Sequence, residues 1–182
     1  MLVLASSSLS RARLLKEAGI SFRQEIINYD ESKVSKDLEP LIFVQRVLLE
    51  KEKQFDEKFA NFKENVLFAD SIVNMNGKIY GKAKDKNEAL KMLNLQSEKN
   101  LCILSAFIFR SKEFKLMSVS STFLKFKEFD KEKLKAYIEN EGFLGKAGAV
   151  ECEGFHKEFI TEMKGEPSTA LGLDIKTLKA YL

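Results

Sequence analysis

One carboxylate interrupts an otherwise apolar stretch of this sequence. Residues 66–73 read Val-Leu-Phe-Ala-Asp-Ser-Ile-Val, and Asp70 is the single charged residue among them. The stretch predicts a buried strand, and a buried carboxylate has to be paired with a cation, hydrogen-bonded or bound to a metal. Asp70 is therefore a candidate catalytic or metal-binding acid, and a structural ion pair is the alternative.

A lysine on the apolar side of a predicted helix is the second candidate. Lys51 lies three residues after Leu48 and four before Phe55, on the apolar stripe, whereas Glu52 falls on another face. The ammonium of such a lysine either enters a cleft and meets an anion, or extends past the apolar surface into water. The sequence leaves both interpretations open.

Two further lysines are candidates, one after a predicted turn and one at the start of a run of small residues. Asn76-Gly77 predicts a hairpin, which would return Lys82 toward Asp70. Lys146 begins the sequence Lys-Ala-Gly-Ala, and small residues of this kind allow a ligand to approach the backbone closely. A tight loop packed on the sheet is the alternative for this second segment.

A serine-rich loop precedes the first predicted helix. Ser6, Ser8 and Ser10 lead directly into Arg11. The free backbone N–H groups at a helix N-terminus bind phosphate well, and hydroxyl and guanidinium groups add further donors. The alternative is an ordinary capped surface helix, since serine is common at the N-cap.

An acidic pair could supply ligands for a metal. Asp30 and Glu31 are adjacent in a polar turn, and hard cations such as Mg²⁺ prefer carboxylate oxygens. A solvated turn is the alternative. Taken together, the serines, cations and carboxylates are the groups needed to bind a metal-bound polyphosphate in a cleft.

The elements that must position these residues alternate along the chain. Strands are expected at 2–5, 21–28, 66–73, 78–80, 101–109 and 117–126, and helices at 11–18, 40–60, 85–95, 130–140 and 174–182. The last two long strands should be antiparallel. This pattern predicts an α/β fold with a mixed sheet.

Composition excludes several classes of protein. Of 182 residues, 45% are hydrophobic and 31% charged, which is typical of a globular chain and not of a disordered one. No apolar run could span a membrane. The net charge is only +3 and lysines alternate with glutamates, so we expect no nucleic-acid partner. With two widely separated cysteines, Cys102 and Cys152, and no signal peptide, a cytoplasmic location is expected.

In chain order, these segments resemble the Maf family of nucleoside triphosphate pyrophosphatases over nearly the whole sequence. The family motif Leu-Ala-Ser-x-Ser-Pro-Arg-Arg-x-x-Leu-Leu corresponds to residues 4–15, and Ala-Asp-Thr-x-Val to residues 69–73. The family's Asp-Glu pair corresponds to residues 30–31 and its helical lysine to residue 51. Its Gly-Lys-Pro motif corresponds to residues 81–83, and its Lys-Ala-Gly-Ala-Tyr motif to residues 146–150.

The resemblance implies a fold and a reaction. It implies one domain over residues 1–182, elongated and two-lobed like the Maf and ITPase folds, with a mixed sheet flanked by helices and a cleft between the lobes. The implied activity is hydrolysis of nucleoside triphosphates, including noncanonical or modified ones, to monophosphate and pyrophosphate. A divalent cation, Mg²⁺ or Mn²⁺, is the implied cofactor, and a homodimer is left open.

The resemblance also assigns roles to residues. Asp70 would be the catalytic carboxylate, acting on the attacking water as proton acceptor or through the metal, and Glu31 would join it as a metal ligand. The residues assigned to phosphate binding are Ser6, Ser8, Arg11, Lys51 and Lys82.

Departures from the family pattern concentrate where the substrate is selected. Ser10 replaces an arginine, Ser71 a threonine and Glu153 a glutamine, while Lys146 matches the family. These four are the expected specificity positions. A carboxylate can only accept hydrogen bonds where an amide both donates and accepts, so an altered base preference is expected. The alternative function is a catalytically weakened nucleotide-binding regulatory protein of the same fold.

Overall fold

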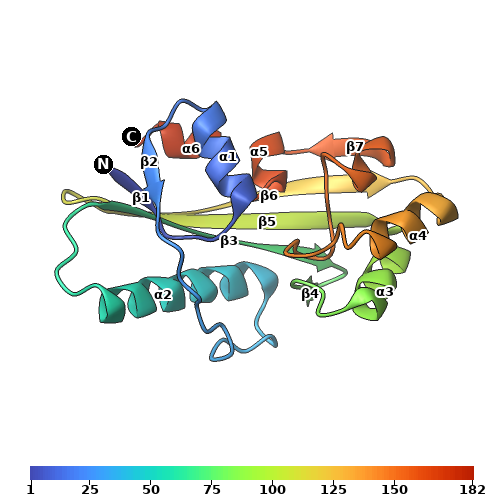
Figure 1. The fold of residues 1–182 in the computed structure, drawn as a ribbon, viewed down its shortest axis with the longest axis horizontal. Helices are drawn as coiled ribbons and strands as arrows, with labels where there is room; N and C mark the ends of the chain where they lie inside the picture. The colour runs from blue at the N-terminus through green and yellow to red at the C-terminus, as the bar shows by residue number, and fades with distance from the viewer.

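The computed structural model describes residues 1–182 and contains one seven-stranded mixed sheet (Figure 1). The strand order is β2-β1-β3-β5-β6-β7, and β4 pairs with β3. β1 is parallel to β2 and β3, whereas all other pairs are antiparallel. The strands are β1 (Leu2–Leu4), β2 (Phe22–Gln24), β3 (Asn65–Met75), β4 (Lys78–Tyr80), β5 (Asn100–Arg110), β6 (Lys115–Phe126) and β7 (Ile160–Lys164).

Local sequence signals start four of the helices. The side chains of Ser8, Asp85, Asp130 and Asp174 each accept a hydrogen bond from the backbone N–H three residues further on, as N-cap residues do. The helices are α1 (Leu9–Glu17), α2 (Pro40–Lys58), α3 (Lys86–Gln96), α4 (Lys131–Glu139), the 3₁₀ helix η1 (Phe155–Glu158), α5 (Pro167–Ala170) and α6 (Ile175–Lys179). No helix is both long and apolar enough to cross a membrane.

Helices cover both faces of one end of the sheet. In Figure 1, α2 lies on one side of the long strands, and α1 and α6 lie on the other. Because side chains alternate along a strand, Val66 and Phe68 of β3 pack in the cluster that contains the apolar side of α2. Leu67 and Ala69 pack instead in the cluster that contains α1 and α6.

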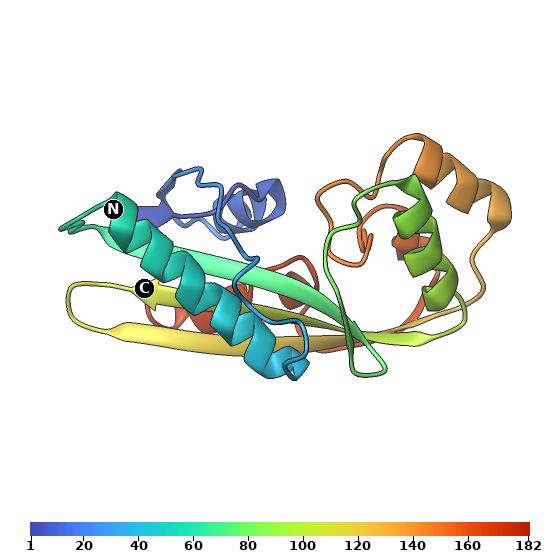
Figure 2. The same ribbon diagram turned by 90° about the horizontal axis from the view of Figure 1, so that it is seen from below.

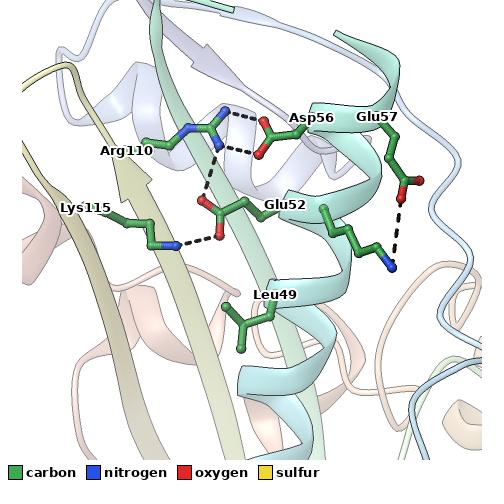
Figure 3. A pocket seen from close by; sticks show the side chains of 7 residues that line it. Leu49, Glu52, Asp56, Glu57, Arg110 and Lys115 are labelled. Atoms are coloured by element: carbon green, nitrogen blue, oxygen red, sulfur yellow. Dashed lines mark hydrogen bonds and ion pairs between the residues drawn. The ribbon is translucent and has the colours of Figure 1, made fainter. Parts of the chain in front are cut away.

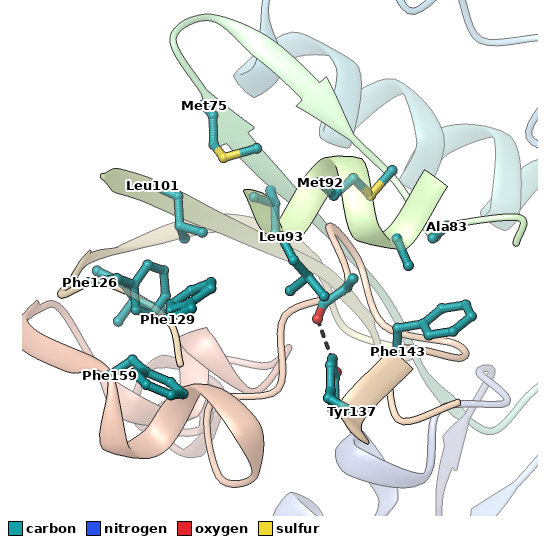
Figure 4. Close-up of a cluster of buried hydrophobic side chains, with 14 of the residues drawn as sticks. Met75, Ala83, Met92, Leu93, Leu101, Phe126, Phe129, Tyr137, Phe143 and Phe159 are labelled. Atoms are coloured by element: carbon teal, nitrogen blue, oxygen red, sulfur yellow. Dashed lines mark hydrogen bonds between the residues drawn. The ribbon is translucent and has the colours of Figure 1, made fainter. Parts of the chain in front are cut away.

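The other end of the sheet carries a separate core. There α3, α4 and η1 gather around buried aromatic side chains, among them Phe126, Phe129, Phe143 and Phe159 (Figure 4). Figure 2 shows α3 and α4 at one end of the sheet and α1 and α2 toward the other, which gives the molecule its elongated, two-lobed shape. The α/β fold class with a mixed central sheet is therefore confirmed.

Most elements occur where the sequence predicts them, with three corrections. The expected strand at 21–28 is only β2 (Phe22–Gln24), because its partner β1 is itself three residues long. The last helix ends at Lys179 instead of residue 182. β7 and α5 were not expected: β7 is an edge strand with mostly exposed side chains, so no hydrophobic alternation marks it.

Candidate active site

The site begins at a gap in the pairing of β3. On one edge, β3 pairs with β1 through residues 65–67 and with β4 through residues 73–75, so residues 68–72 have no strand beside them there. Asp70 and Ser71 lie in this gap and point to opposite faces of the sheet. The gap therefore lets side chains from both faces reach one cleft.

Asp70 lies on the α2 side and forms a compact charged cluster. Lys51 of α2 donates a hydrogen bond from Nζ to Asp70 Oδ1 at 2.6 Å and contacts Glu31 Oε1 at 2.8 Å. The side chains of Lys51 and Asp70 are only 9% and 13% exposed. The Lys51 ammonium does not extend into water past the apolar surface; it enters the cleft between two carboxylates. The Tyr29 ring lies 5.7 Å from the same ammonium.

Ser71 lies on the α1 side and contacts Arg11. The guanidinium donates to Ser71 Oγ at 3.0 Å, to Ser6 Oγ at 3.1 Å and to the Gly172 carbonyl at 2.9 Å. Burial lowers the pKa of Arg11, while the charge of Asp70 acts in the opposite direction. Gly172 has φ +108°, a backbone conformation that favours glycine, and this conformation presents its carbonyl to Arg11.

The opposite wall of the cleft belongs to the other lobe. Lys82 follows β4 and forms an isolated β-bridge with Ala147, which brings the segment 142–154 beside the end of β3. The side chain of Lys82 is exposed and its ammonium has no hydrogen-bond or ion-pair partner, whereas the Lys146 ammonium contacts the Gly142 carbonyl at 2.5 Å and Glu151 at 3.1 Å. At Gly148, φ is +58° and a Cβ would lie 2.8 Å from Val73 Cβ, so this packing requires glycine.

These walls enclose a cleft of about 900 Å³. Eleven of the residues predicted for the site line it: Ser6, Ser8, Ser10, Arg11, Glu31, Lys51, Asp70, Ser71, Lys82, Lys146 and Glu153. Asp30, the neighbour of Glu31, does not; its side chain accepts from Ser32 N and is exposed. Cys152 also lines the cleft, and burial together with the charge of Glu153 raises the pKa of its thiol to about 12, so it is a poor nucleophile.

The carboxylates allow a limited test of the expected metal. No group of three or more His, Cys, Asp or Glu side chains suited to a metal ion is present. Asp70 and Glu31 nevertheless both place an oxygen within 2.8 Å of the Lys51 ammonium. Mg²⁺ is commonly held by one or two carboxylates, with substrate phosphates and water completing its octahedron. Two carboxylates this close together suit a cation that arrives with a phosphorylated substrate, but that cation would have to displace the Lys51 ammonium from between them.

Comparison with known proteins identifies the family. The family model described as Maf-like protein matches residues 1–182. The chain belongs to the Maf family. Among curated relatives, a protein named nucleoside triphosphate pyrophosphatase from Campylobacter jejuni is 54% identical over 186 positions and is covered completely, as is this chain. Relatives of the same name from Nitratiruptor and Helicobacter pylori are 36% and 33% identical, covering 98% and 100% of this chain and 96% and 94% of their own lengths.

One solved structure is also similar to this Maf protein. The Staphylococcus aureus Ham1 protein aligns with a TM-score of 0.46 at 12% sequence identity, covering 71% of each chain.

The Maf cleft also contains residues that the sequence did not single out for the site. Arg13 forms an ion pair with Glu153 across the cleft, and Leu9 and Leu144 line it with 82% and 54% of their surface exposed. Behind the cleft lining, the buried Ser105 places its Oγ 2.8 Å from Ser71 Oγ and donates to the Thr169 carbonyl at 2.7 Å. Among these residues, only Arg13 could have been found from the sequence, because it lies one helical turn after Ser10 and therefore on the same face of the predicted helix.

This Maf protein has a second hollow, of about 670 Å³, and the side chains that line it form a network of ion pairs (Figure 3). Glu52 contacts Arg110 at 3.3 Å and Lys115 at 2.9 Å, and Arg110 also pairs with Asp56 at 2.8 Å. The sequence placed Glu52 away from the apolar stripe, but it is as buried as Lys51, because the β5–β6 hairpin covers it. Its charge is fully matched, so this hollow is a structural feature.

Proposed function

We propose that this protein hydrolyses nucleoside triphosphates to a nucleoside monophosphate and pyrophosphate. The observation that carries the proposal is the convergence of one carboxylate, Asp70, with Lys51, Lys82 and the N-terminus of α1 in a single cleft. An acid beside several phosphate-binding cations is what water attack on a phosphate anhydride requires. Membership of the Maf family and the name of its curated relatives support the same reaction.

The cations hold the triphosphate. Lys82 has no partner in the protein, so its ammonium is available to a phosphate oxygen. Ser6 and Ser8 lie at the N-terminus of α1, where free backbone N–H groups favour anions. Arg11 is held by Ser6, Ser71 and Gly172 and acts mainly as a fixed positive charge behind the phosphates. Lys51 exchanges part of its contact with Asp70 for a contact with the substrate.

Asp70 acts on the attacking water. Its carboxylate accepts a proton as the water oxygen bonds to the α-phosphorus, and the bond from that phosphorus to the α,β-bridging oxygen breaks. The bond pair leaves with pyrophosphate, whose negative charge the lysines stabilise. The Lys51–Asp70 contact orients the carboxylate within the gap of β3.

Asp70 and Glu31 are the residues that would hold Mg²⁺ or Mn²⁺. When bound, the cation neutralises phosphate charge and polarises the phosphoryl group. We expect activity to require it. We place the reaction in the cytoplasm, which agrees with the two unpaired cysteines, Cys102 and Cys152.

Base selection is assigned to four residues of the cleft. Ser10, Ser71, Lys146 and Glu153 line the cleft together with the phosphate-binding groups. Ser105 donates to the Thr169 carbonyl, and the Ser71 hydroxyl has two acceptors within the protein, Ser105 Oγ at 2.8 Å and the Gly172 carbonyl at 3.3 Å, so Ser71 offers a ligand mainly acceptor capacity. With Glu153 also an acceptor, bases that present N–H donors are favoured over bases that present carbonyls.

The test is a panel of canonical and modified triphosphates with Mg²⁺ or Mn²⁺, assayed for pyrophosphate. We expect release from at least one member and loss of release after chelation by EDTA. Calorimetry on the same preparation separates the alternative function. Tight triphosphate binding without pyrophosphate would instead identify a nucleotide-binding regulatory protein, and folded protein that neither binds nor turns over any member would contradict both.

A further inference from the structure

An ion pair joins the two lobes across the cleft. Arg13 Nη2, on α1, contacts Glu153 Oε2, in the segment between α4 and η1. The residues are separated by 140 positions in the sequence. No other hydrogen bond or ion pair joins α1 to the segment 142–154, so this contact, the rim ion pair, is the sole polar link between these two walls.

The exposure of the two side chains places them at the rim of the cleft. Arg13 and Glu153 are 46% and 50% exposed, whereas Lys51 and Asp70 on the cleft floor are 9% and 13% exposed. Both rim residues line the same cleft as the floor residues. A nucleotide that fills the cleft with its phosphates on the floor therefore places its nucleoside near the rim ion pair.

The rim ion pair is weak enough for a ligand to break. Exposed pairs of this kind change an equilibrium constant by only about two- to fivefold. Arg13 also has a second partner, Glu17, one turn further along α1 at 3.7 Å. When Glu153 is taken by another donor, Arg13 thus keeps a carboxylate beside it, and Glu153 becomes a free acceptor facing the cleft.

We propose that Arg13 is a specificity-determining residue that competes with the substrate for Glu153. The carboxylate of Glu153 is bound to Arg13, and a nucleobase gains that acceptor only by displacing the guanidinium. Bases that direct an exocyclic amino group at Glu153 can make the exchange, whereas bases that direct an exocyclic carbonyl there cannot. The inference rests on the proposed function in taking a nucleoside triphosphate as the ligand.

A double-mutant cycle tests this competition. We compare Arg13→Gln, Glu153→Gln and the double variant on two matched substrate pairs, CTP against UTP and ATP against ITP, which differ in an amino or a carbonyl group. Arg13→Gln should raise the kcat/KM ratio of amino to carbonyl substrate by about two- to fivefold in the wild-type background. In the Glu153→Gln background it should have no effect. A shift of equal size in both backgrounds would mean that Arg13 contacts the base directly, and the competition would be refuted.

Hydrogen exchange tests the rim ion pair without any substrate. Amides of the segment 142–154 should exchange faster in Arg13→Gln and in Glu153→Gln than in the wild type. At 0.5 M salt the exchange rates of the wild type should rise toward those of the two variants, because salt screens exposed ion pairs. The control is Lys133→Gln, which removes the similarly exposed Lys133–Glu158 pair of the same lobe, outside the cleft lining. Unchanged exchange in the rim variants would overturn the inference, whereas absence of turnover in the wild type would count against the proposed function alone.

Discussion

Two adjacent residues of α2 are buried to the same extent but contact different parts of the molecule. With backbone and side chain counted together, Lys51 and Glu52 each have 7% of their surface exposed. Lys51 points to the gap in β3, where it meets Asp70 and Glu31. Glu52 points to the β5–β6 hairpin, where Arg110 and Lys115 meet it. One helix thus carries a charged cluster on each side of its apolar stripe.

The difference between the two clusters lies in what surrounds the charges. Around Glu52, the Arg110 guanidinium is fixed by a two-pronged contact with Asp56 and lies 5.9 Å from the Phe55 ring. Every charge there has a partner within the protein. Around Lys51, the partners line a cleft that also holds the unpaired Lys82. Burial of a charge alone therefore does not distinguish the two clusters; an adjoining cleft with an unmatched charge does.

Asp70 should show the largest effect of any single change. Asp70→Asn removes the proton acceptor and keeps the shape, so we expect kcat to fall about 10²- to 10⁴-fold with triphosphate binding retained. Steady-state kinetics and calorimetry measure the two effects. Asp30→Asn is the control, because Asp30 lies outside the cleft lining; an Asp70→Asn enzyme with more than a tenth of normal activity would remove Asp70 from the chemistry.

Lys51 should show the next largest effect, again on activity. Lys51→Met removes a charged hydrogen bond to phosphate and the contact that orients Asp70, so kcat/KM should fall about 10- to 100-fold, through both KM and kcat. Lys53→Met, on the exposed face of the same helix, should change neither constant by more than about twofold. Equal effects of the two substitutions would end the distinction between the faces of α2.

His156 extends the comparison to a buried group without charge. It is fully buried, Nδ1 accepts from Glu151 N, and burial lowers its pKa to about 3. The unfolded chain, with a histidine pKa of about 6.5, binds this proton first as pH falls. The His156 contribution to stability is therefore complete above pH 6.5 and declines from there toward pH 3, by about 2 kcal/mol at pH 5.

Urea unfolding at pH 7 and pH 5 measures this loss in the free energy of unfolding, and His156→Gln should remove that part of the pH dependence. In the folded wild-type protein, the imidazole proton resonances of His156 should not titrate between pH 5 and 8. A measured pKa near 6.5 in the folded protein would contradict the buried, neutral assignment.

Glu52 should show the smallest effect, and on stability only. Glu52→Gln removes the charge that Arg110 and Lys115 share, so the free energy of unfolding should fall by about 1–2 kcal/mol. Turnover by the folded variant should stay within about twofold of wild type. A loss of activity comparable to that of Lys51→Met would show that the second cluster belongs to the site.

Much of the fold could be predicted because its signals are local. The capping residues Ser8 and Asp85, the Asn76-Gly77 turn and the apolar run of β5 each fix an element within a few residues. β7 could not be predicted, because an exposed edge strand needs only a backbone partner, here β6, and has no pattern of its own.

The site was predictable to a similar degree. Asp70 and Lys51 could be found because each is a charge in an apolar context, and Lys82 because a hairpin precedes it. Glu52 does lie on another face of α2 than Lys51, but its burial could not be predicted, nor could the place of Arg13 in the cleft, because their partners, Arg110 and Glu153, are 58 and 140 residues away. No local pattern carries that information.

The sequence by itself determined which elements and side chains this protein has: the capped helices, the strands, and a family pattern with its serines, its lysines and Asp70. Only the tertiary structure decided which charges share a cleft. Pairing of β3 with β1 at one end and β4 at the other leaves a gap that admits side chains from both faces of the sheet. Contacts between segments far apart in the chain depend on this pairing, and for that reason Lys51 and Glu52, adjacent in sequence, belong to different parts of the molecule.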